Sequence, residues 1–202
     1  MSGTRGLTPK DTRKMSPYIQ FGIQNLRINA IEVRTAKTGA KQCVLSMESR
    51  PVTVPGFEGI DGAQGQVGKV YFPQYWLKLD NADALQSFFE QVALIGDKLG
   101  VRDAIDAVDF TNFDDYISRI TPIIKNRYAW WKLVVEEYER EGKDPGKKLA
   151  LPKWGFVANE AEGESHLKFD KSKGYDYKAV GSTSNTADAT ALDTVAKDDL
   201  PF

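Results

Sequence analysis

Alternating hydrophobic and polar residues predict strands in the first quarter of the chain. Over residues 18–34, apolar positions alternate with polar ones, and the alternation changes parity after Ala30. Such a change within a strand is typical of a β-bulge, which bends the strand. A turn around Gly39 and a second alternating run over 41–47 complete a predicted β-hairpin. The second run places Cys43, Leu45 and Met47 inward and Gln42, Ser46 and Glu48 outward.

A third strand and two helices are predicted next. Residues 51–68 contain five glycines and two prolines, and we expect a mobile loop there, followed by a strand over 69–76. Asn81 is a favourable N-cap, and apolar residues recur after it at i, i+3 and i+4 as far as Gly100, which predicts a helix. A second helix is expected after Thr111.

Two further strands are predicted over 127–138 and 149–159, joined by a polar hairpin loop. The order of three strands, a helical connection and two strands is that of a five-stranded Greek-key barrel of the OB type. We therefore predict a mainly β fold of this type, with an enlarged helical connection between strands 3 and 4 and a disordered acidic C-terminal tail. A different α+β sheet is the alternative.

The composition divides the chain into four segments. Residues 1–16 are basic and lack apolar periodicity, so we expect a flexible arm, and 17–160 hold the predicted barrel. In residues 161–178, lysines are interleaved with aromatic residues, which fits either a solvated linker or an ordered extension that contacts a ligand or a neighbour. Residues 179–202 have too little hydrophobicity to offset the entropy of ordering, and we expect them to be disordered.

Composition and charge exclude several classes of function. The chain has 202 residues, a net charge of −1, one cysteine (Cys43) and one histidine (His166). These numbers argue against zinc sites, His-based catalytic triads and disulfides. The sequence also lacks a Walker motif and a Gly-x-Ser-x-Gly elbow, and its adjacent carboxylate pairs point to different faces. We therefore expect no metal, no cofactor and no enzymatic activity. The apolar runs are too short for a bilayer span, and the first residues lack the apolar region of a secretion signal. We expect a cytoplasmic protein without a membrane partner.

The predicted fourth strand carries the clearest binding signal. Alternation places Tyr128, Trp130 and Lys132 on one face, opposite a face that includes Trp131. Aromatic rings beside cations are typical of single-strand binding, because bases stack on the rings and cations reach the phosphates. The alternative is that the helices or the tail cover these rings. The candidate DNA-binding residues are Arg27, Arg34, Lys37, Lys41, Lys69, Tyr71, Arg127, Tyr128, Trp130, Lys132, Lys153 and Trp154.

The last five residues resemble a known protein family. The sequence Asp198-Asp199-Leu200-Pro201-Phe202 is similar to the C-terminal tip of bacterial and phage single-stranded DNA-binding proteins, in which acidic residues precede a hydrophobic-Pro-Phe end. The resemblance implies an OB domain that binds single-stranded DNA largely without sequence preference in replication, recombination and repair. It also implies that the tip recruits polymerase-, helicase-, primase- or nuclease-class enzymes, in a bacterial cell or a phage-infected host.

The body departs from that family. It lacks the opening-strand motif of the bacterial housekeeping protein, and its helical connection is longer, so the resemblance is to a divergent phage-type member. Self-association is left open. Two other functions remain: a single-strand annealing recombination protein, which would form rings, and a protein-interaction or structural component that does not bind DNA.

Overall fold

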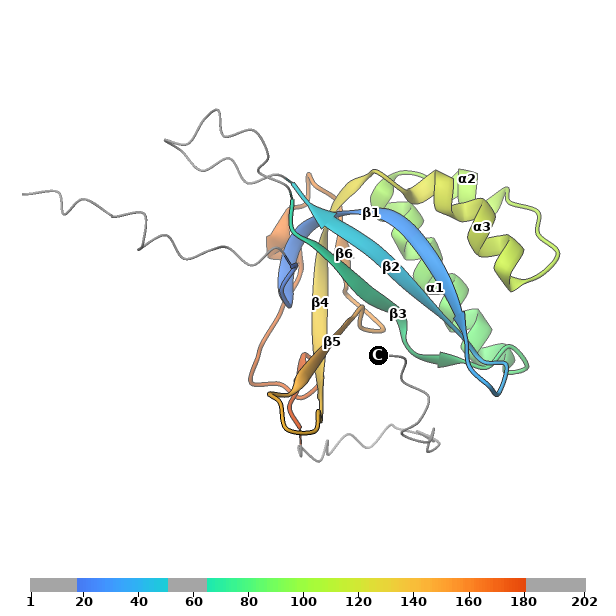
Figure 1. Cartoon of the computed structure of the whole chain (residues 1–202). Helices are drawn as coiled ribbons and strands as arrows, with labels where there is room; N and C mark the ends of the chain where they lie inside the picture. Colours follow the sequence, from blue (N-terminus) through green and yellow to red (C-terminus); the bar gives the residue numbers. More distant parts are fainter. Residues whose placement is uncertain (1–17, 51–64, 181–202) are drawn as a thin grey trace, which may run out of the picture.

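The computed structural model describes residues 18–50 and 65–180 (Figure 1). The predicted basic arm, most of the glycine-rich loop and residues 181–202 of the acidic tail lie outside these residues. The same is true of the proposed partner-binding residues Asp198, Asp199, Leu200, Pro201 and Phe202.

Five strands of the sheet pair in a ring. They are β1 (Gly22–Thr35), β2 (Lys41–Ser49), β3 (Val67–Leu77), β4 (Tyr128–Tyr138) and β5 (Gly146–Ala150). The hydrogen-bonded order is β1-β2-β3-β5-β4, and β4 pairs back with β1. The β3–β5 pair is parallel, and the other four pairs of the ring are antiparallel. The prediction of a mainly β fold with a ring-like five-stranded sheet is confirmed.

A bend in β1 lets this strand pair with two neighbours. Its register with β2 shifts between Ile28 and Ala30, close to the predicted parity change. The first half of β1, from Gly22 to Arg27, pairs with β4, and the second half pairs with β2. The irregularity therefore lies where the strand leaves one partner for the other, as a β-bulge allows.

Three helices fill the connection between β3 and β4 and lie together on one side of the ring (Figure 1). They are α1 (Ala82–Leu99), α2 (Arg102–Asp106) and α3 (Phe113–Ile124). The Asn81 side chain accepts a hydrogen bond from the Ala84 amide, and Gly100 adopts the left-handed conformation with φ 67°. The predicted ends of α1 are confirmed. The short helix α2 was not predicted, because five residues are too few to display a helical period.

The apolar core is continuous from the ring into the helices. Trp131 of β4 is fully buried, and its indole N–H donates to the Leu26 carbonyl over 2.9 Å. The Phe88 ring of α1 lies 5.2 Å from the rings of both Phe72 on β3 and Phe113 on α3. These contacts fix the helices against the inner face of the strands and leave the outer faces of β3 and β5 for other contacts.

Two details of the strand predictions are corrected. The predicted strand over 149–159 is two strands, β5 and β6 (Val157–Ala158), which both pair with β4. Pro152 lacks an N–H donor, and Gly155 has φ 59°, so the chain between them leaves the sheet. Gln42 was expected to face outward, but it is only 1% exposed because its amide donates to the Pro73 and Gln74 carbonyls.

Residues after β6 pack on the ring. They contain the 3-10 helix η1 (Glu164–His166) and β7 (Tyr177–Lys178). Strand β7 pairs in parallel with β4 at Val135 and Glu136, beyond the positions of β4 that pair with β1. Through residue 178 the segment is thus an ordered extension that contacts β4. In the part of the chain that the structure describes, α1 and the shorter helices lack the length and apolar character of a membrane-spanning helix.

Candidate nucleic-acid interface

A groove of about 360 Å³ runs between residues 18–21 and the strands β3 and β5. We call it the β3–β5 groove. Lys69 and Tyr71 point into it because they alternate with Val70 and Phe72, which are buried in the core. The groove is lined by Tyr18, Ile19, Gln20, Phe21, Gly68, Lys69, Tyr71, Lys147, Lys148 and Leu149.

Gly68 allows residues 18–21 to form one wall of the groove. The Ile19 amide donates to the Val67 carbonyl over 3.1 Å, and the Ile19 side chain is buried. A Cβ atom on residue 68 would lie 2.3 Å from Cγ1 of Ile19, which is closer than any real contact. A glycine is therefore required at this position for the wall to lie directly against β3.

Two cations lie close to the Tyr71 ring. Nζ of Lys148 on β5 is 4.4 Å from the centroid of the Tyr71 ring, and Cζ of Arg34 on β1 is 5.7 Å from it. Nη1 of Arg34 also donates to the Tyr71 hydroxyl over 3.3 Å. We call Arg34, Tyr71 and Lys148 the Tyr71 cluster. It combines an aromatic surface with positive charge, a pairing that cation–π attraction stabilises.

The cations of the Tyr71 cluster repel one another. Burial lowers the pKa of Lys148, and the nearby Arg34 lowers it further, whereas Glu136 opposes the shift. Glu32 lies 3.9 Å from Arg34 and 3.7 Å from Lys69, and both of these distances exceed ordinary hydrogen-bond length. An anion bound between Arg34 and Lys148 would relieve this repulsion. The chemistry of the site therefore favours a ligand that carries both a negative charge and a flat ring.

A second aromatic group lies beside the groove. The Phe21 ring is 5.8 Å from the ring of Phe169 and 5.2 Å from that of Tyr177. Nζ of Lys147 is 5.4 Å from the Phe21 centroid, and Nζ of Lys171 is 5.0 Å from the Tyr177 centroid. We call Phe21, Lys147, Phe169, Lys171 and Tyr177 the Phe21 cluster.

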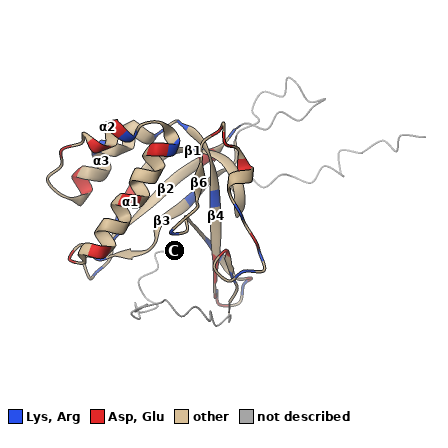
Figure 2. Cartoon of the chain, turned by 180° about the vertical axis from the view of Figure 1, so that it is seen from behind, with Lys and Arg blue, Asp and Glu red and all other residues tan. Residues whose placement is uncertain are grey.

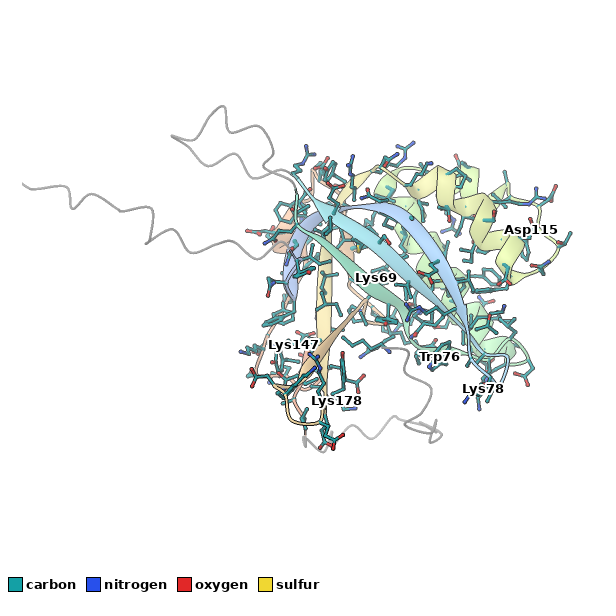
Figure 3. The ribbon with its side chains drawn as sticks, in the orientation of Figure 1. Lys69, Trp76, Lys78, Asp115, Lys147 and Lys178 are labelled. Atoms are coloured by element: carbon teal, nitrogen blue, oxygen red, sulfur yellow. The ribbon has the colours of Figure 1, made fainter. Side chains whose placement is uncertain are left out.

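Glu137 holds the Phe21 cluster on β4. It accepts hydrogen bonds from the Tyr177 hydroxyl and from the Val180 amide. These bonds, the first being the stronger influence, lower the pKa of the Glu137 carboxyl, and the nearby Lys147 and Lys171 add to the shift. In Figure 3, Lys147 and Lys178 lie together at the end of the ring where β4 and β5 meet, and Lys69 lies over β3.

The helical layer has the opposite charge. Residues 82–124 contain eight acidic and three basic residues, a net charge of −5, and Figure 2 shows acidic positions on all three helices. Another hollow, of about 340 Å³, lies among these helices and is lined by Phe89, Phe110 and Tyr116 together with Glu90 and Asp106. Arg102 also lines this hollow and pairs with Asp106, so the hollow lacks the excess of cations that would attract a polyanion to the β3–β5 groove.

The structure separates the predicted DNA-binding residues into several groups. Arg34, Lys69 and Tyr71 come together at the β3–β5 groove. Arg27 and Tyr128 lie elsewhere, with the Arg27 guanidinium 5.7 Å from the Tyr128 ring and bonded to Glu48 over 2.8 Å.

Tyr128 and Trp130 are partly buried, and Arg27 and Arg50 beside Tyr128 each pair with a glutamate. Arg50 lies 4.1 Å from the Tyr128 ring and pairs with Glu160 over 2.6 Å. Trp130 lies between Asn25 of β1 and Ala158 of β6. Arg127 donates to the Ile123 carbonyl. The residues after β6 thus reach over this part of β4, which leaves less ring surface and less free positive charge than the sequence alone indicated.

Lys132 and Lys41 are paired with carboxylates and do not form an exposed basic face. Lys132 is only 8% exposed and pairs with buried Asp176 of the extension over 2.5 Å. This corrects the expectation that it lies on an exposed face. Lys41 bonds to Asp114 of α3 and to the Thr35 hydroxyl, both over 2.9 Å. The carboxylates that pair with these lysines, Asp114 and Asp176, lie in distant parts of the chain. The alternation of apolar and polar residues along a strand cannot reveal such long-range contacts.

The remaining predicted residues lie in connections between strands. Lys37 is in the β1–β2 turn. Lys153 and Trp154 lie between β5 and β6, with Nζ of Lys153 5.4 Å from the Trp154 ring. Trp154 is 57% exposed. None of the three lines the β3–β5 groove.

Of the residues that line the groove, sequence reasoning had identified only Lys69 and Tyr71 as binding residues. Lys147 and Lys148 were overlooked because the fifth strand was expected to begin at Leu149. Phe21 was overlooked because a single aromatic residue near a strand end carries no pattern. The alternation of lysines with Phe169 and Tyr177 was the available sequence signal for a binding role of the extension. The same alternation was also compatible with a solvated linker.

Within residues 18–50 and 65–180, no group of three or more His, Cys, Asp or Glu side chains is placed to hold a metal ion. No protein-family model matches the sequence, and a search of the curated proteins found no match.

Proposed function

We propose that this protein binds single-stranded DNA, without catalysing a reaction and with little base preference, and that the β3–β5 groove receives the strand. The observation that carries the proposal is the Tyr71 cluster, in which Arg34 and Lys148 both lie close to one aromatic ring. Single-strand binding proteins combine aromatic rings that stack on bases with a positively charged groove that follows the backbone.

The physical chemistry favours a single strand over a duplex. A base can stack on Tyr71 only if it is not already stacked between its neighbours in a duplex. Every base has an aromatic face, so this contact tolerates all sequences. Arg34, Lys69 and Lys148 would contact phosphates, and release of the bound counterions would make the affinity depend on salt.

The order in which the strands pair supports a more specific proposal for the type of barrel. We propose that the ring β1-β2-β3-β5-β4 is an OB-type Greek-key barrel, with the helices as an enlarged connection between β3 and β4. OB folds bind oligonucleotides on the face of strands 2 and 3 and with the loops after strands 1 and 4. Lys69 and Tyr71 are on β3, and Lys147 and Lys148 directly follow the β4–β5 loop.

The acidic segment 198–202 would supply the partner interaction. Its resemblance to the tip of single-stranded DNA-binding proteins supports recruitment of replication and repair enzymes in a bacterial cytoplasm. Binding assays with purified enzymes of the polymerase, helicase, primase and nuclease classes, with and without residues 198–202, test this part. Capture that does not depend on the segment would contradict it.

A titration of fluorescently labelled oligo-dT at several salt concentrations tests the central proposal, with a duplex of the same length as control. We expect preference for the single strand and a log–log salt slope of about −0.7 per phosphate contact. Equal affinity for the duplex would exclude stacking as the basis of binding.

A further inference from the structure

We propose that the Phe21 cluster is a second nucleotide-binding subsite, so that a strand bound at Tyr71 continues along the β3–β5 groove to Tyr177. The ordered extension would then be part of the interface. This inference rests on the proposed function and deepens it, because it assigns a ligand to residues 167–178. The ligand at this subsite is a further nucleotide of the same single strand.

The two clusters are connected through β5. Lys147 and Lys148 are consecutive residues, and consecutive side chains of a strand point to opposite sides. Lys148 accordingly reaches the Tyr71 ring, whereas Lys147 reaches the rings of Phe21 and Tyr177. Both lysines, Phe21 and Tyr71 line the same groove. Although the two lysines point to opposite sides of β5, residues of both clusters line this one groove, so a strand bound at Tyr71 can reach Phe21 and Lys147 of the Phe21 cluster.

The Phe21 cluster has the chemistry that a nucleotide requires. Its three rings are only partly buried, and none of them belongs to the apolar core. Nζ of Lys171 lies 5.7 Å from the Phe21 centroid, and Nζ of Lys147 lies 5.8 Å from the Tyr177 centroid. Two exposed lysine side chains beside partly exposed rings can contact a phosphate while a base stacks on a ring.

The extension is held in a defined position. Oδ2 of Asp176 accepts a hydrogen bond from the Asp170 amide over 2.8 Å, and Oδ1 pairs with Lys132 of β4. The Asp176 amide donates to the Lys173 carbonyl over 2.9 Å. These bonds close the turn that presents Lys171 and place Tyr177 beside Phe21. The subsite is therefore organised before any ligand binds, which lowers the entropic cost of binding.

The competing explanation is that the aromatic rings only attach the extension to Phe21, which directly precedes β1. Charge substitutions separate the two explanations, because Lys147→Gln and Lys171→Gln leave the ring packing in place. The matched control is Lys125→Gln, which removes an exposed lysine at the end of α3. If the subsite binds DNA, each groove variant should show a log–log salt slope smaller in magnitude by about 0.7 and a several-fold lower affinity at low salt. The control should match the unmodified protein.

Photo-cross-linking locates the strand directly. Oligo-dT carrying 5-iododeoxyuridine at successive positions is irradiated with the full-length protein, and the cross-linked peptides are identified by mass spectrometry. We expect cross-links to Phe21 or Tyr177 at positions that differ from those linked to Tyr71. Cross-links confined to Tyr71, together with Lys147→Gln and Lys171→Gln proteins that bind like the control, would overturn the second subsite and leave the proposed function intact. Absence of oligo-dT binding by the unmodified protein would overturn both.

Discussion

Lys148 on β5 places its ammonium group 4.4 Å from the centre of the Tyr71 ring on β3, in a parallel pair of strands whose residues are almost eighty positions apart in the sequence. Arg34 of β1 completes the arrangement through its hydrogen bond to the Tyr71 hydroxyl. The Tyr71 cluster thus brings two cations and one aromatic ring together on the outer surface of the sheet.

Replacing Tyr71 by alanine should weaken binding of oligo-dT by about 1–3 kcal/mol, the usual contribution of one base–aromatic stack. Tyr71→Phe should keep most of the affinity because it removes only the hydroxyl that Arg34 contacts. Trp154→Ala, which removes an exposed ring outside the groove, serves as the control. Fluorescence anisotropy measures all three. A larger loss from Trp154→Ala than from Tyr71→Ala would place the strand elsewhere.

Two adjacent tryptophans of β4 should have different roles in stability. Trp131→Ala should lower the free energy of unfolding by about 3–5 kcal/mol, because it empties a fully buried site and leaves the Leu26 carbonyl without its indole donor. Trp130→Ala should cost clearly less, since Trp130 is only partly buried. Urea denaturation followed by circular dichroism measures both values. Similar losses for the two variants would contradict the assignment of faces.

The Lys132–Asp176 pair should hold the extension on β4. Asp176→Ala leaves a buried ammonium group without its partner, and such a loss typically costs about 3–5 kcal/mol. The double variant Lys132→Met/Asp176→Leu should recover part of this loss because it removes both charges. Hydrogen exchange of residues 167–178 and urea denaturation report the effect. If the single variant exchanges no faster than the unmodified protein in this segment, the pair does not fix the extension.

Cys43 should be unreactive in the folded protein. It is fully buried, and burial raises the pKa of its thiol to about 12, so the reactive thiolate is scarce at neutral pH. Ellman's reagent should therefore modify it slowly in buffer and rapidly in denaturant, with one thiol per chain. Rapid modification under native conditions would show that β2 opens readily.

Stability should fall in acid through Glu48. Hydrogen bonds from Arg27 and Asn29 lower the pKa of the Glu48 carboxyl below its ordinary value of 4.5. A carboxyl with a lowered pKa in the folded state stabilises the protein above its unfolded-state pKa, and this contribution disappears as the pH falls through the folded-state pKa. The difference in unfolding free energy between the unmodified protein and Glu48→Gln should therefore be largest near neutral pH and shrink below pH 4.5. A difference independent of pH would contradict the prediction.

Local patterns were sufficient for most elements of the fold. The parity change in β1 predicted the bend, because side chains alternate with a period of two on any strand. Asn81 and Gly100 predicted the ends of α1, since capping depends on residues adjacent to the helix. The fully buried face of β4 around Trp131 was likewise evident from alternation.

Alternation predicts which face a residue occupies, but not what covers that face. Lys132 and Trp130 share the predicted face, yet Asp176 buries the lysine and β6 flanks the tryptophan. Both neighbours follow β4 in the sequence and return to it by pairing over long distances. These contacts carry no local signature, because they depend on where the extension packs after the ring has closed.

The sequence by itself determined β1 to β4, the helices α1 and α3, the order of these elements and the supply of aromatic and basic residues. Only the tertiary structure decided that Phe21, Tyr71 and Lys148 line one groove, while Lys41 and Lys132 are engaged by carboxylates. The physical reason is that periodicity reports the local backbone, whereas a binding surface depends on which cations remain accessible after long-range pairing has engaged the others.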